Sequence, residues 1–127
     1  MKKILNFCIV FVLAFLVFAG CYFRETKKFN KADWNDLSGG YFNKRGPMLE
    51  DLLTNHQLKG KNIGQLRKLF GQKDLGVYEY DHQLIIYMNI ITDFGWNIDP
   101  QYTKDLYLYL NKDSVVTSFK VKEYHSK

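Results

Sequence analysis

The histidines and acidic residues are the side chains of this chain that could perform acid–base chemistry or bind a metal ion. His56, His82 and His125 lack the spacing of metal ligands, and His56 extends an apolar helical pattern that is typical of a partly buried structural residue. Asp81 and His82 are adjacent in an extended segment, so their side chains point to opposite faces and cannot pair directly. The sequence therefore predicts no metal site and no cofactor.

The remaining candidates for catalysis are equally weak. Asp33 and Asp36 form a carboxylate pair of the kind that loops commonly hold in solvent. Gly39-Gly40 is not followed by the Lys-Ser/Thr of a phosphate-binding loop, and no serine has the context of a strained nucleophile turn. We therefore expect a protein that is not an enzyme.

Cys21 has a more informative context. It follows the small residues Ala19 and Gly20, at the end of an apolar run that starts shortly after two lysines. Positive charge, an apolar segment and small residues before a cleavage point are the three parts of a secretory signal. With a cysteine directly after the small pair, the segment resembles a bacterial lipoprotein signal peptide. The resemblance implies that residues 1–20 are removed and that Cys21 carries diacylglycerol and an acylated amino group, which anchor the protein in a membrane.

The alternative for the apolar run is a transmembrane helix. Ile4 to Ala19 spans 16 residues and includes Asn6, whereas a spanning helix needs about 20 apolar residues. Phe18 stands where lipoprotein signals most often have leucine. The short run favours a signal peptide, so membrane attachment is expected through lipid on Cys21.

Composition limits what the remainder of the chain can be. The 107 residues after the predicted signal suffice for one small domain. Loss of two lysines with the signal lowers the formal net charge from +5 to +3, which is too mild to indicate a nucleic-acid partner. With Cys8 removed and Cys21 lipidated, the domain has no thiol and no disulfide, so its core alone must stabilise it.

Two helices are predicted after residue 45. Gly46-Pro47 favours a helix start, and an apolar stripe follows it until Lys59-Gly60-Lys61. Asn62 predicts the N-cap of a second helix, since Gln65 three residues later completes a capping-box pattern, and Gly71 ends it. The short connection requires the two helices to meet as a compact unit.

Three strands are predicted after the helices. Residues 78–90 alternate as one strand, with every second residue from Tyr78 to Ile90 facing the core. Leu106, Leu108 and Leu110 form the apolar side of a second strand, and residues 115–122 form a third, with Val115, Thr117, Phe119 and Val121 on one side. The short connections favour antiparallel neighbours.

The resulting order is α-α-β-β-β, which predicts an α+β fold with two N-terminal helices packed on a three-stranded antiparallel sheet. We expect a signal peptide over residues 1–20, a lipidated N-terminus and tether over 21–45, and the domain over 46–127. Trp34, Leu37 and Tyr41 could bring part of the tether onto the domain.

At this point the chain resembles the BamE (SmpA/OmlA) family of outer-membrane lipoproteins. The resemblance rests on Cys21 and on residues 58–71, LKGKNIGQLRKLFG, followed by a tyrosine-bearing strand, a long loop and two more strands. Where the family usually has Ser or Thr, Glu and Pro, this chain has Asn62, Gln65 and Lys73. The resemblance implies a periplasm-facing protein of the outer membrane, beside the machine that inserts β-barrels.

An aromatic surface is the remaining candidate for function. Tyrosine and tryptophan are favoured at recognition sites because they offer a large rigid area with a polar tip. The alternative is that the aromatic rings of the loop and the sheet pack structurally, as cross-strand pairs or under the Trp34 segment. Tyr87 lies on the same outer face of the sheet. The candidate partner surface, on the long loop and the outer face of the sheet, consists of Phe94, Trp96, Tyr102, Tyr107 and Tyr109.

The expected function is that of a scaffold or protein-interaction module in outer-membrane assembly or integrity. The alternative is an inhibitor-like or binding lipoprotein that uses the same fold against an unrelated periplasmic protein. A carrier of lipids or small ligands would need an internal cavity, for which a two-layer domain of this size leaves little room.

Overall fold

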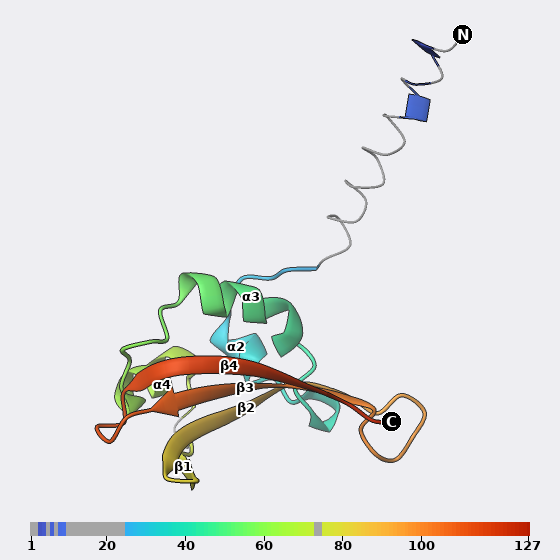
Figure 1. Ribbon diagram of the computed structural model, residues 1–127. Coiled ribbons are helices and arrows are strands. Elements are labelled where there is room, and N and C mark those ends of the chain that lie inside the picture. Colours follow the sequence, from blue (N-terminus) through green and yellow to red (C-terminus); the bar gives the residue numbers. More distant parts are fainter. Residues whose placement is uncertain (1–2, 5, 7, 10–24, 73–74) are drawn as a thin grey trace.

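A computed structural model describes residues 3–4, 6, 8–9, 25–72 and 75–127 of the chain. In this part, three helices lie on one face of a four-stranded antiparallel sheet with the strand order β1-β2-β3-β4 (Figure 1). The expected α+β class is confirmed, and the expected two helices and three strands are wrong, because the described residues form one more of each. Cys21 lies outside the described residues.

The helical layer comprises α2 (Lys31–Trp34), the short 3-10 turn η1 (Ser38–Gly40), α3 (Arg45–Asn55) and α4 (Ile63–Phe70). The capping box of α4 is confirmed, because the Asn62 side chain accepts a 2.9 Å hydrogen bond from the Gln65 amide and the Gln65 side chain accepts one of 2.9 Å from the Asn62 amide. Gly71 ends α4 with φ 68°, a left-handed conformation that glycine adopts without steric cost.

The sheet consists of β1 (Tyr78–Tyr80), β2 (Gln83–Asp93), β3 (Tyr102–Leu110) and β4 (Val116–His125). The predicted single strand over residues 78–90 is therefore wrong. The chain reverses at Asp81 and His82, whose φ angles are 49° and 61°, and Tyr80 pairs directly with Gln83. Left-handed backbone at both central residues is the geometry of a tight two-residue hairpin turn, and Asp and His tolerate it better than most residues.

This turn reverses the predicted orientation of the first tyrosines. Residues directly opposite each other in an antiparallel pair share a face, and Tyr78 lies opposite Ile85. Tyr78 and Tyr80 are accordingly 58% and 76% exposed on the outer face, and they do not face the core. The turn cannot be recognised from the sequence pattern, because a two-residue loop does not interrupt the alternation of apolar and polar residues.

Irregularities in β2 and β4 adjust the inward pattern of those strands. The pairing of β3 with β4 skips Thr117, so that Val116 is buried in the core and Phe119 and Val121 follow in the shifted phase. The prediction that Val115 and Thr117 share the core side with Phe119 and Val121 is therefore wrong, because a β-bulge inserts one unpaired residue and reverses the alternation beyond it.

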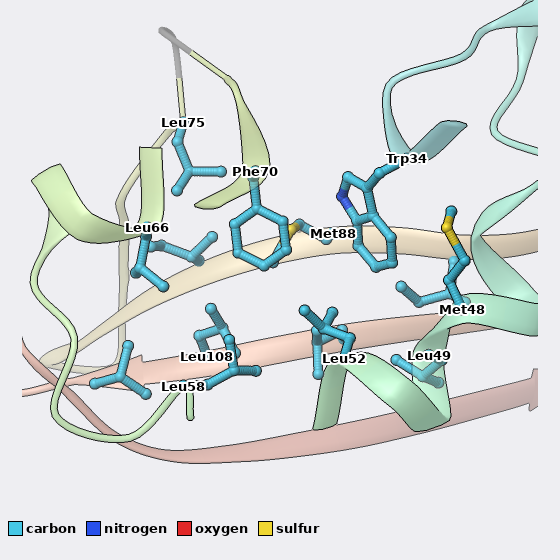
Figure 2. Packing of buried hydrophobic residues seen from close by; sticks show 14 of the residues in the cluster. Trp34, Met48, Leu49, Leu52, Leu58, Leu66, Phe70, Leu75, Met88 and Leu108 are labelled. Carbon is cyan, nitrogen blue, oxygen red and sulfur yellow. The ribbon is translucent and has the colours of Figure 1, made fainter. Parts of the chain in front are cut away.

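The core lies between the helices and the sheet (Figure 2). Trp34 is fully buried in it and contacts Phe29 and Phe70, with ring centroids 5.5 Å from each. The segment before it lies against α3, since the Phe29 amide donates a 2.7 Å hydrogen bond to the Asp51 carboxylate. Part of the predicted tether thus packs on the domain through Trp34, whereas Leu37 and Tyr41 remain about half exposed.

Candidate interaction surface

Strands β1, β2 and β3 present a cluster of tyrosines on the sheet face opposite the helices. Strand register brings them together, since Tyr78 lies opposite Ile85, Ile85 opposite Tyr109, and Tyr87 opposite Tyr107. No described helix lies over this face (Figure 1). We call this cluster the tyrosine face and define it by Tyr78, Tyr80, Tyr87, Tyr107 and Tyr109.

The centre of the tyrosine face is held by specific contacts. The Tyr87 hydroxyl donates a 3.0 Å hydrogen bond to the Asp105 carboxylate, which also accepts a 2.9 Å bond from the Asn89 side chain. The rings of Tyr87 and Tyr107 pack edge to face with centroids 5.4 Å apart, and the ammonium of Lys122 lies 4.3 Å from the Tyr107 centroid. These contacts fix the central rings in one orientation.

Partial burial, followed by the hydrogen bond to the Asp105 carboxylate, raises the pKa of Tyr87 to about 12. The phenol is therefore a neutral hydrogen-bond donor at physiological pH. A neutral aromatic surface with polar tips is suited to recognition.

The tyrosine face is shallowly hollowed. An open groove of about 940 Å³ runs over it and is lined by all five tyrosines together with Ile85, Asp105 and Lys122. Within the described residues no three His, Cys, Asp or Glu side chains come together in a way that could hold a metal ion. Because Glu79 and Asp81 also line the groove, it can offer charged groups at its edge in addition to aromatic and apolar contact and hydrogen bonds.

Two of the five predicted surface residues, Tyr107 and Tyr109, lie on the tyrosine face, but Tyr102 does not. Tyr102 lies opposite His125, in the same phase as the buried Leu106, so it belongs to the helix side of the sheet. Its hydroxyl donates a 3.1 Å hydrogen bond to Glu123, and its ring centroid lies 4.8 Å from that of His125. Tyr102 and Tyr107 are five positions apart in the same strand, and an odd separation places two side chains on opposite faces.

Phe94 and Trp96 lie on the long loop between β2 and β3, which extends from the end of the sheet remote from β1 (Figure 1). Phe94 is half-buried beside Tyr41, with ring centroids 6.0 Å apart. Trp96 is fully exposed, and Ile98 on the same loop is 95% exposed. The structure thus divides the predicted surface into a tyrosine face and a separate apolar loop.

The alternating sequence pattern predicts that Tyr78 and Tyr80 face the core, whereas both are surface residues. The signal that could have placed them is Asp81-His82, a pair of residue types that tolerate left-handed backbone, between two strand-like segments. Cys21, the predicted lipidation site, is outside the described residues, and the structure does not bear on it.

Comparison with known proteins gives no relative. No family model, no curated protein and no solved structure matches this chain. Among the described residues, no helix has the length and apolar character needed to cross a membrane.

Proposed function

We propose that this protein is a non-enzymatic, lipid-anchored protein of the bacterial cell envelope that binds a partner protein through its tyrosine face. The observation that carries the proposal is an aromatic sheet face that no described element covers. The predicted signal peptide and lipidation of Cys21 supply the location, and the resemblance to the BamE family supplies outer-membrane assembly or integrity as the process.

Large aromatic rings on a solvent-exposed sheet face contribute little to the stability of the fold. The outer side of β4 carries lysines in place of large rings, since Lys120 and Lys122 are exposed there. Cross-strand stacking accounts for Tyr87 and Tyr107, because such pairs stabilise a sheet by about 0.2–1 kcal/mol. Cross-strand stacking does not account for Tyr78 and Tyr80, which pack against no other aromatic ring within the described part of the chain. Their exposure favours recognition.

Site-specific photo-cross-linking tests the proposal directly. A photoreactive amino acid at Tyr80 or Tyr109 should give a cross-linked product in intact envelopes, whereas the same group at Lys68, exposed on α4 in the helical layer, should not. Mass spectrometry then identifies the product. Cross-links from Lys68 with none from Tyr80 or Tyr109 would contradict the proposed surface.

The identity of the cross-linked protein separates the two candidate processes. Subunits of the β-barrel assembly machine would support a role in outer-membrane assembly. A different periplasmic protein, with that machine absent, would support the inhibitor-like or binding alternative.

Substitution of the most exposed rings provides a second test. The double variant Tyr78→Ala/Tyr80→Ala should lose partner capture with a nearly unchanged melting temperature, because neither ring packs in the core. Trp96→Ala is the matched control for an exposed aromatic residue outside the tyrosine face. Loss of capture in Trp96→Ala alone would move the binding site to the loop.

A further inference from the structure

Arg45 is a charged residue inside the core. It is only 2% exposed at the first residue of α3, and its guanidinium lies between two aromatic rings, 3.3 Å from the Phe42 centroid and 4.8 Å from that of Trp34. Its Nε donates a 2.7 Å hydrogen bond to the Trp34 carbonyl, and its Nη1 donates one of 2.7 Å to the Asn89 carbonyl. These contacts hold the guanidinium in one position.

The hydrogen bonding of Arg45 is incomplete. Its Nη2 is shielded from solvent, and among the described residues it has no acceptor and no carboxylate pairs with the side chain. The indole Nε1 of Trp34, in the same stack, is also a buried donor for which the described part of the chain supplies no acceptor. Buried charges in proteins are normally paired, because an uncompensated charge in a medium of low dielectric is costly. Burial accordingly lowers the pKa of Arg45 to about 10.

A groove adjoins this unsatisfied cation. It has a volume of about 440 Å³, within the range of small-molecule sites, and Arg45 forms part of its wall. Phe42, Leu75 and Met88 give it an apolar lining, while Gln72 and Asn89 add neutral polar groups. Arg45 is the one cation among its described lining residues, which suits a ligand with a single negative charge.

We propose that this groove binds the carboxylate group of a small ligand with an apolar body, and that Nη2 of Arg45 donates to it. A carboxylate supplies the missing acceptor and the missing negative charge together. The apolar wall then contacts the remainder of the ligand. Because Nη2 is shielded in the free protein, the half-buried side chain of Phe42 or Gln72 shifts as the ligand enters. The groove shares Tyr78 and Tyr87 with the tyrosine face, but the inference rests on the Arg45 guanidinium, unpaired among the described residues, and not on partner binding.

The test compares propionate with propionamide, which has nearly the same shape but no charge. The full chain in detergent micelles is labelled with ¹⁵N, and the arginine side-chain signals are followed at constant ionic strength. The sequence has three arginines, Arg24, Arg45 and Arg67, so the spectrum is simple to assign. Propionate should shift the Arg45 signals saturably, with a dissociation constant on the order of millimolar, as expected for a ligand of few atoms. Propionamide should leave them unchanged.

Three outcomes would overturn the proposal. The first is an equal response to propionamide, and the second is a response to propionate that does not saturate. The third concerns Asp74, a carboxylate outside the described residues. If the Asp74→Asn variant changes the Arg45 signals without any ligand, the chain supplies its own acceptor and the groove needs no other.

A variant of the cation provides the complementary measurement. Arg45→Gln removes the charge and should abolish the propionate response of the amide signals of Leu75 and Met88. If this variant does not fold, the wild-type comparison of propionate with propionamide decides the question by itself.

Discussion

Tyr87 joins two strands through its hydroxyl group, because its partner Asp105 belongs to β3 and its own backbone belongs to β2. Asp105 also accepts from Asn89, so one carboxylate organises the polar floor of the tyrosine face. A charged acceptor strengthens these hydrogen bonds relative to neutral ones. At the scale of single residues, the candidate surface therefore has a pre-organised centre and a freer edge formed by Tyr78 and Tyr80.

The titration of Tyr87 tests this description. Its pKa of about 12 lies above the ordinary 10.0, so the neutral phenol stabilises the folded state fully below pH 10, and this contribution is lost as pH rises from 10 to 12. Asp105→Asn should lower the pKa of Tyr87 while leaving it above 10, because partial burial is the larger cause. ¹³C NMR of the tyrosine ring carbons measures both values. A wild-type Tyr87 that titrates near pH 10 would refute the contact.

Lipidation is also a prediction at the scale of one residue. Cys21→Ala should abolish incorporation of labelled palmitate, because the variant lacks the thiol that accepts diacylglycerol in the lipoprotein pathway that the signal resembles. Cys8→Ala is the matched control, since Cys8 lies within the predicted signal and should not affect labelling. Retained label in Cys21→Ala would exclude this anchor.

At the scale of elements, the β1–β2 hairpin determines the composition of the candidate surface. Its two-residue turn places Tyr78 beside Ile85 on the outer face, next to rings from β3. Without the turn, a single extended strand would direct Tyr78 and Tyr80 to the core side. Two backbone hydrogen bonds hold the start of β4 against the loop before α4. The Gly60 amide donates to the Val116 carbonyl, and the Val116 amide donates to the Lys61 carbonyl.

The capping box of α4 yields a prediction of stability. Asn62→Ala should lower the free energy of unfolding by about 1 kcal/mol, because the Gln65 amide loses its acceptor at the N-terminus of the helix. Chemical denaturation with urea measures the change. Lys68→Ala, at an exposed position of the same helix, is the control and should stay within about 0.5 kcal/mol of the wild type. An equal effect of both substitutions would mean that the cap contributes nothing specific.

At the scale of the whole molecule, the segment from residue 25 to Arg45 is part of the folded unit. Trp34 lies between Phe29 and Phe70, and the Asn35 side chain donates a 2.6 Å hydrogen bond to the carbonyl of Phe70 at the end of α4. The buried Arg45 connects the same segment to β2 through the Asn89 carbonyl. Removal of residues before α3 would therefore open the core.

The two tryptophans allow a matched test of this view. Trp34→Ala should destabilise the protein by about 3–5 kcal/mol, as is usual for truncation of a large buried aromatic side chain. Trp96→Ala should change stability by less than about 0.5 kcal/mol, because the indole is fully exposed. Thermal or denaturant unfolding of both variants measures the difference. Similar stabilities would show that the N-terminal segment does not belong to the core.

Local chemistry explains what the sequence by itself determined. The capping box at Asn62, the glycine end of α4 at Gly71 and the inward leucines of β3 all follow from interactions between residues close in the chain. The α+β class follows from their order, because amphipathic helices and a one-sided sheet must bury their apolar faces against each other.

Only the tertiary structure decided where several other residues lie. The reversal at Asp81 and His82 leaves the alternating pattern intact, so pattern alone cannot distinguish one long strand from a hairpin. A bulge at Thr117 changes the inward phase of β4 with no mark in composition. The burial of Arg45 depends on carbonyls 11 and 44 residues away, which become neighbours only when the chain has folded. Short-range preferences therefore set the elements, and long-range pairing set which side chains they expose.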